Sequence, residues 1–258
     1  MTTTEQSPEL SIVMPAYNEA ANIASVLEST TRHMERSGIR YEINVVDDGS
    51  DDGTGRLLEK MAQRQPRLRI VRHDVNLGYG AAIRSGLEAS RGQHILVSDG
   101  DGQFSIEDLG PLWDRREQAD MVLGYRAPRH DPPVRRFAGW MYSRVLVRLT
   151  LGGRFRDVNC GFKLISRPVI DGMKLESTGA LISAELLTRA RLSGARFVEV
   201  GVRHFPRRYG KATGLLPQVV IRMFGELMTL RRNIMRASRK RRGNGLRPDC
   251  DAVESASA

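Results

Sequence analysis

The stretch Ile95-Leu96-Val97-Ser98-Asp99-Gly100-Asp101-Gly102-Gln103 joins a short apolar run to two aspartates that are one residue apart. If the run is a strand and the backbone stays extended beyond Ser98, Asp99 and Asp101 point to the same side. Two converging carboxylates repel each other, and a divalent cation such as Mg²⁺ or Mn²⁺ between them relieves that repulsion. An acidic β-turn punctuated by glycines fits the same residues. The stretch alone therefore leaves a metal site and a turn open.

The N-terminal half around this stretch alternates between apolar runs and helical patterns. Strands are expected at 10–14, 41–46, 68–72, 94–98 and 121–124, and helices at 19–34, 54–62 and 79–90, with a further helix after Ser105. Asn18, Thr54 and Ser105 are expected to cap the helices that follow them. The alternation predicts an α/β fold with a mainly parallel sheet that helices cover on both faces.

Polar residues follow the first, second and fourth expected strands. In open α/β sheets, ligands bind outside the carboxyl ends of the strands. We therefore expect one cleft to collect a set of residues that are far apart in the sequence. The set is Tyr17, Asn18, Glu19, Asp47, Asp48, Asp99 and Asp101.

The pattern changes after Gly124. A loop rich in Pro, Arg and Asp is expected at 126–136, followed by a helix at 137–151, an irregular stretch at 152–161, a strand at 162–165, a helix at 182–192, a strand at 197–202 and a basic loop at 204–213. Residues 216–236 carry an apolar stripe at helical spacing, which could pack on the sheet or lie on a membrane surface. The tail at 238–258 is basic and then small and polar, so we expect it to be disordered.

Composition narrows the class of protein. The chain has 258 residues, of which 40% are apolar, which suits one large α/β domain or one domain with appendages. Its 2 cysteines and 5 histidines show no disulfide or zinc pattern. Neither a signal-like start at 1–9 nor an apolar run of about 18 residues occurs, so a cytoplasmic location is expected.

The charge is uneven along the chain. The formal net charge is +10, and 203–247 contains thirteen Lys and Arg against one acid, Glu226. This segment predicts a partner that carries phosphate or an anionic surface. Nothing else in the chain suggests base readout, so no nucleic acid partner is expected.

Four ordered motifs carry a family resemblance. They are Met14-Pro15-Ala16-Tyr17-Asn18-Glu19, Val45-Val46-Asp47-Asp48-Gly49-Ser50-x-Asp52-Gly53-Thr54, Asn76-Leu77-Gly78-Tyr79-Gly80 and Asp99-Gly100-Asp101-Gly102-Gln103. Their order and spacing resemble the family-2 inverting glycosyltransferases, and among these the dolichol- and polyprenyl-phosphate mannosyl- and glucosyltransferases. Two further matches, Asp157-x-x-Cys160-Gly161-Phe162-Lys163 and Pro206-Arg207-x-x-Gly210, extend the resemblance over about 11–210.

The resemblance implies a nucleotide-binding fold of the GT-A type over 10–214, with a nucleotide-sugar half at 10–125 and an acceptor half at 126–214. A flexible N-terminus at 1–9, an amphipathic helix at 215–237 and the tail at 238–258 would flank it. Donor-binding residues would be Pro15, Tyr17, Glu19, Asp47, Asp48, Gly78 and Asp99. A Mg²⁺ or Mn²⁺ ion would be held by Asp99, Asp101 and Gln103.

The resemblance also implies an acceptor-phosphate site. Its residues would be Arg126, Arg135, Arg136, Arg207 and Lys211, and the catalytic residues would be Asp99, Asp101 and Arg126. The chain departs from the family pattern in two places. Gly139 stands where serine is common, and Lys211-Ala212-Thr213 replaces the usual Ser-Lys.

The expected reaction is transfer of a hexose, mannose from GDP-mannose, to a polyprenyl phosphate, by a protein held peripherally on the cytoplasmic face of a membrane. A divalent ion and nearby arginines would offset the charge on the leaving nucleoside diphosphate. A lipid phosphate is already an anion, whereas a hydroxyl acceptor needs a carboxylate base. Asp157 and Glu185 are the candidates for that base, although a salt bridge or helix cap suits both. A non-catalytic protein that binds nucleotide sugar or membrane is the remaining alternative.

Overall fold

The computed structural model describes residues 7–127, 155–207 and 232 of the chain. Several residues named above lie outside the described part, among them Arg135, Arg136, Gly139 and Lys211. The helices expected at 137–151 and 216–236 and the tail also fall there. The proposed division of the chain into segments therefore stays a prediction.

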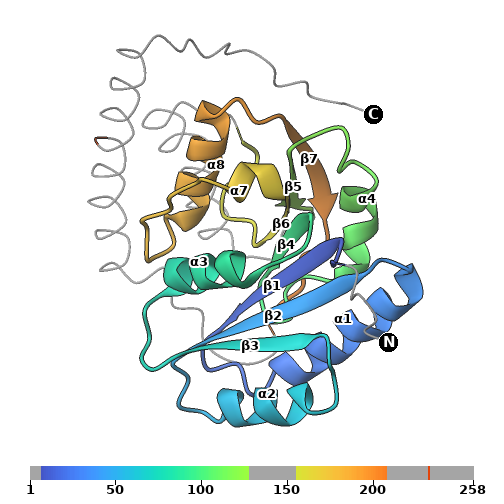
Figure 1. Cartoon of the computed structure of the whole chain (residues 1–258), viewed down its shortest axis with the longest axis vertical. Coiled ribbons are helices and arrows are strands. Elements are labelled where there is room, and N and C mark those ends of the chain that lie inside the picture. Colours follow the sequence, from blue (N-terminus) through green and yellow to red (C-terminus); the bar gives the residue numbers. More distant parts are fainter. Residues whose placement is uncertain (1–6, 128–154, 208–231, 233–258) are drawn as a thin grey trace, which may run out of the picture.

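A seven-stranded sheet with the order β3-β2-β1-β4-β6-β5-β7 forms the centre of the fold (Figure 1). Its strands are β1 (Leu10–Ala16), β2 (Tyr41–Asp48), β3 (Leu68–His73), β4 (His94–Ser98), β5 (Met121–Arg126), β6 (Phe162–Ser166) and β7 (Phe197–Val202). Most pairings are parallel, but β6 runs antiparallel to both β4 and β5. The mainly parallel sheet is confirmed, and β6 brings the second half of the chain beside β4.

Helices cover both faces of this sheet, as expected (Figure 1). They are α1 (Ile23–Ser37), α2 (Thr54–Ala62), α3 (Tyr79–Ala89), the 3₁₀ turn η1 (Ile106–Asp108), α4 (Leu109–Trp113), α7 (Arg167–Ile170) and α8 (Ile182–Leu192). Alternate residues of β1 face the two layers: Ile12 and Met14 join the core with α1, α2 and α4, whereas Val13 joins the core with α3 and α8. Burial on both faces explains why the strands are continuous apolar runs.

Two of the three expected helix caps are wrong. Asn18 adopts a left-handed conformation with φ 55°, and α1 begins only at Ile23. Gly53, with φ 95°, caps α2 in place of Thr54. Ser105 does cap η1, since its hydroxyl accepts a hydrogen bond from Glu107 N at 3.3 Å.

The side chains of Asn18 and Thr54 connect two loops instead. Asn18 Oδ1 accepts from Asp51 N at 3.0 Å, and Thr54 Oγ1 accepts from Glu19 N at 3.0 Å. The loops after β1 and β2 are thereby tied together at the carboxyl edge of the sheet. Among the described helices, none is both long and apolar enough to span a membrane.

Candidate active site

Asp99 and Asp101 follow β4 at the carboxyl edge of the sheet. The chain turns at Gly100 and Asp101, so the backbone does not stay extended beyond Ser98 and the turn that the sequence left open is present. The two carboxylates nevertheless interact, because burial and then the charge of Asp101 raise the pKa of Asp99 to about 7. The stretch is therefore a turn that carries two carboxylates whose charges repel each other.

Two neighbours fix the carboxylate of Asp99. The Tyr79 hydroxyl donates a hydrogen bond to Asp99 Oδ1 at 2.8 Å. Burial and the charge of Asp99 raise the pKa of Tyr79, which keeps its hydroxyl a donor. On the other side the carboxylate packs against Gly161, where an added Cβ would lie 1.9 Å from Asp99 Oδ2. Only glycine leaves room for Asp99 there.

Asp101 and Gln103 contact the segment that follows β7. Asp101 Oδ1 accepts from Gln103 N at 3.0 Å, and Gln103 Nε2 donates to the Phe205 carbonyl at 3.2 Å. Arg207 pairs with Glu19, and its Nη1 lies 3.6 Å from Asp101 Oδ2. Residues after β1, β4 and β7 therefore meet, as the sequence predicted for Glu19 and Asp101. The metal role of Gln103 and the phosphate role of Arg207 stay predictions.

Asp47 is fully buried at the end of β2. Its Oδ1 accepts from Ser50 N at 3.1 Å. Its Oδ2 accepts no hydrogen bond from the part of the chain that the structure describes, although Arg72 Nε lies 3.9 Å away. A buried oxygen that accepts no hydrogen bond from the protein is a candidate acceptor for an N–H group of a ligand. The neighbouring strand β1 contains Pro15, and Tyr17, which follows that strand, is 48% exposed.

Asp48, by contrast, is occupied by the protein. Its carboxylate accepts from Leu77 N and Gly78 N, both at 2.9 Å, and lies 2.7 Å from His73 Nδ1. It therefore holds the loop before α3, and the Gly78 N–H is committed to it. The donor-binding roles of Asp48 and Gly78 are indirect in this geometry, through the placement of that loop.

The two candidate bases for a hydroxyl acceptor both have structural partners. Asp157 binds Arg126 in a bidentate pair, with distances of 2.7 Å from Nε and 3.0 Å from Nη2. Glu185 is fully buried and accepts from Ser177 N at 2.7 Å and from Arg189 Nε at 2.7 Å. These contacts fit structural roles for Asp157 and Glu185, such as a salt bridge, rather than the role of a catalytic base.

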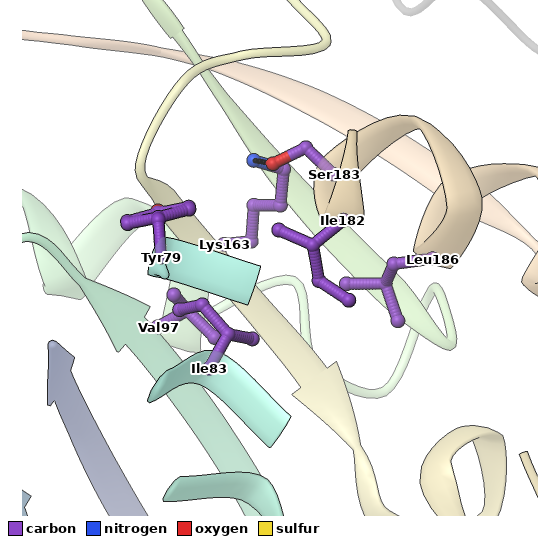
Figure 2. Close-up of a pocket in the computed structure, with 7 residues that line it drawn as sticks. All are labelled: Tyr79, Ile83, Val97, Lys163, Ile182, Ser183 and Leu186. Atoms are coloured by element: carbon purple, nitrogen blue, oxygen red, sulfur yellow. Dashed lines mark hydrogen bonds between the residues drawn. The ribbon is translucent and has the colours of Figure 1, made fainter. Parts of the chain in front are cut away.

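Lys163 adds a buried ammonium group that sequence reasoning gave no role. Its Nζ donates to the Cys160 carbonyl and to Ser183 Oγ, the latter at 3.4 Å. Burial lowers the pKa of Lys163, while the charge of Asp99 opposes that shift. With Tyr79 and Ser183 it borders a cavity of about 10 Å³, which is roughly the space of one water molecule (Figure 2). The motif from Asp157 to Lys163 was the sequence signal for this group.

Asp99 and Asp101 fit a divalent cation by their chemistry. Both offer hard oxygen ligands, and their mutual repulsion favours a positive charge beside them. The described residues contain no cluster of three or more His, Cys, Asp or Glu that could bind a metal alone. Mg²⁺ usually takes one or two carboxylates and completes its shell with phosphate and water.

Comparison with known proteins identifies the family. Residues 11–173 match the profile described as "Glycosyl transferase family 2". The chain belongs to glycosyltransferase family 2. It is 32% identical over 172 residues to a dolichyl-phosphate beta-glucosyltransferase of Trichomonas vaginalis, covering 60% of this chain and 51% of that protein.

Other relatives support the same family. A dodecaprenyl-phosphate galacturonate synthase of Rhizobium johnstonii is 30% identical over 209 residues, covering 80% of this chain and 61% of that protein. The chain thus spans only 51% and 61% of the lengths of these two curated relatives. Among solved structures, glucosyl-3-phosphoglycerate synthase of Mycobacterium tuberculosis with Mn²⁺, UDP and phosphoglyceric acid superposes with a TM-score of 0.64 at 21% identity, covering 87% of this chain and 78% of that one. This likeness confirms the GT-A type of fold.

Proposed function

We propose that this chain is an inverting glycosyltransferase that moves a hexose from a nucleotide sugar to a polyprenyl phosphate. The observation that carries the proposal is the position of Asp99 and Asp101 directly after β4, at the carboxyl edge of the sheet, with Asp101 beside Arg207. Relatives named for dolichyl-phosphate and dodecaprenyl-phosphate sugar transfer support the choice of acceptor.

Each part of the site has a role in this proposal. Asp47 Oδ2 would accept an N–H of the nucleobase, and Asp99 and Asp101 would hold Mg²⁺ or Mn²⁺ next to the diphosphate. When bound, the ion supplies positive charge to the leaving group. Arg126 and Arg207, together with Arg135, Arg136 and Lys211 outside the described residues, would hold the acceptor phosphate.

The acceptor then needs no protein base. An oxygen of the lipid phosphate attacks the anomeric carbon, and the bond from that carbon to the diphosphate oxygen breaks. The nucleoside diphosphate leaves with the electron pair, and a single displacement inverts the anomeric centre. Because Asp157 and Glu185 are engaged by Arg126 and by backbone N–H groups, the geometry favours this route over a hydroxyl acceptor.

The proposal also includes the identity of the sugar donor and the cellular location of the protein. We take GDP-mannose as the donor from the motif resemblance, and UDP-glucose is its competitor because one relative is named for glucosyl transfer. We place the protein on the cytoplasmic face of a membrane, through the basic and amphipathic sequence at 215–258.

The test is a donor screen that follows radiolabelled sugar entering a short-chain polyprenyl phosphate, with and without Mn²⁺. Replacing a metal ligand in Asp101→Asn should slow transfer about 10²- to 10³-fold, which is about 3–4 kcal/mol of barrier. Asp114→Asn makes the same change at an exposed position after α4 and should transfer normally. Full activity of Asp101→Asn, or transfer to a hydroxyl compound alone, would contradict the proposal.

A further inference from the structure

The first turn of α3 is held between two parts of the chain. On one side the Asp48 carboxylate accepts hydrogen bonds from the backbone N–H groups of residues 77 and 78. On the other side the Thr178 carbonyl accepts from Gly80 N at 2.7 Å and from Ala81 N at 3.3 Å. The fit is tight, because a Cβ on Gly80 would lie 2.5 Å from the Ser177 carbonyl oxygen. This turn carries Tyr79, whose hydroxyl holds Asp99.

The loop that presents the Thr178 carbonyl depends on Glu185 of α8. Glu185 Oε1 accepts from Glu176 N at 3.0 Å, and Oε2 accepts from Ser177 N at 2.7 Å. Arg189 Nε donates to the same carboxylate at 2.7 Å and balances its charge. A carboxylate accepts at both oxygens and can satisfy all these donors at once, which an amide cannot. Figure 2 shows Tyr79 and side chains of α8 bordering one cavity, so the two elements are neighbours.

We propose that Glu185 is a positioning residue for Asp99, acting through the 176–178 loop and Tyr79. Glu185 fixes the Thr178 carbonyl, that carbonyl fixes the first turn of α3, and the turn sets the Tyr79 hydroxyl against Asp99. The inference rests on the proposed function, in which Asp99 binds the metal. Ligand orientation by such neighbours matters, since removing them typically weakens metal binding 10- to 100-fold.

The test measures binding of Mn²⁺ alone by electron paramagnetic resonance. Glu185→Gln keeps the size of the side chain but loses one acceptor oxygen, and Tyr79→Phe removes the hydroxyl. We expect each variant to weaken Mn²⁺ binding about tenfold or more. If Glu185 acts through Tyr79, the double variant should bind about as weakly as the weaker single variant. Losses that multiply in the double variant would overturn the proposal.

Hydrogen exchange at residues 77–81 gives a second, metal-free readout. Glu185→Gln should speed exchange there about tenfold or more, whereas Glu88→Gln should leave it unchanged. Glu88→Gln is the matched control because it makes the same change at an exposed position near the end of α3. If Glu185→Gln does not fold, Gly80→Ala displaces the same contact from the α3 side and should give the same pattern. Unchanged exchange at 77–81 in the tested variant would overturn the proposal.

These readouts separate the inference from the proposed function. A wild-type protein that binds Mn²⁺ but transfers no sugar to polyprenyl phosphate would contradict the proposed function alone. If the wild-type protein transfers sugar but Glu185→Gln binds Mn²⁺ as tightly as the wild type, only the inference about Glu185 is contradicted.

Discussion

Gly161→Ala tests directly how Asp99 is positioned. The added Cβ would lie 1.9 Å from Asp99 Oδ2 and 2.4 Å from its Cγ. To restore ordinary van der Waals contact at 3.4 Å, the carboxylate must move by about 1.5 Å. That shift breaks the 2.8 Å hydrogen bond from Tyr79. Overpacking costs about 1–3 kcal/mol, so the free energy of unfolding should fall by about that amount.

Gly161→Ala should weaken metal binding more than it lowers the stability of the fold. A binding constellation tolerates displacement of about 0.5 Å, and the expected shift of Asp99 exceeds that. We therefore expect Gly161→Ala to weaken Mn²⁺ binding about tenfold or more, measured by titration at a temperature where the variant is folded. Urea unfolding gives the stability change.

Gly110→Ala is the matched control for this experiment. Gly110 lies in α4, where an added Cβ meets nothing within 4 Å. The same methyl group should there leave Mn²⁺ binding unchanged and stability equal or slightly higher. Wild-type Mn²⁺ affinity in Gly161→Ala would refute the reasoning, because Asp99 would then not depend on the space at residue 161.

Two further substitutions test the charges of the fold and of the site. Burial raises the pKa of Glu42, but hydrogen bonds from Ser11 and Arg91 outweigh it and hold that pKa below its usual value. The stability that these hydrogen bonds give is present above about pH 4.5 and is lost as the pH falls through the pKa of folded Glu42. In urea unfolding, Glu42→Gln should therefore lower the free energy of unfolding by about 1.5–3 kcal/mol at pH 7 and by less at pH 3.5. An equal loss at both pH values would contradict this reasoning. Arg207→Gln should tighten Mn²⁺ binding without donor, because the guanidinium lies 3.6 Å from Asp101 Oδ2, and should slow transfer to polyprenyl phosphate at least tenfold. Weaker Mn²⁺ binding in Arg207→Gln would show that this arginine supports the metal site instead.

The strands were predictable because their periodicity is strong. Ile12 and Met14 face one layer and Val13 the other, so β1 is apolar throughout and stands out in the sequence. The place of β6 between β4 and β5 was not predictable, because its pairing joins residues that are far apart in the chain. The cap errors have a different origin. Asn and Thr suit a cap and a loop crosslink equally, and only tertiary contacts decide between them.

The site was predictable only in part. The sequence indicated that residues after β1 and β4 would meet, and Glu19 and Asp101 do meet around Arg207. It gave no role to Tyr79 as the donor to Asp99 or to the space at Gly161, although both residues stood in quoted motifs. Such contacts depend on how α3 and the segment before β6 approach β4, which no local pattern encodes.

The hydrogen-bond partners of the buried acids distinguish residues that look alike in the sequence. Asp48, Glu185 and Asp157 all looked like candidates for chemistry. Asp48 and Glu185 accept from backbone N–H groups, and Asp157 is paired with an arginine. Such carboxylates gain their stabilisation from the protein, and their negative charge is satisfied on folding. Asp99 accepts a hydrogen bond from the Tyr79 hydroxyl, and burial and then the neighbouring charge of Asp101 raise its pKa to about 7. Folding therefore leaves at Asp99 an unfavourable charge that a bound cation would relieve, which is why we propose Asp99, rather than the other buried acids, as a metal ligand.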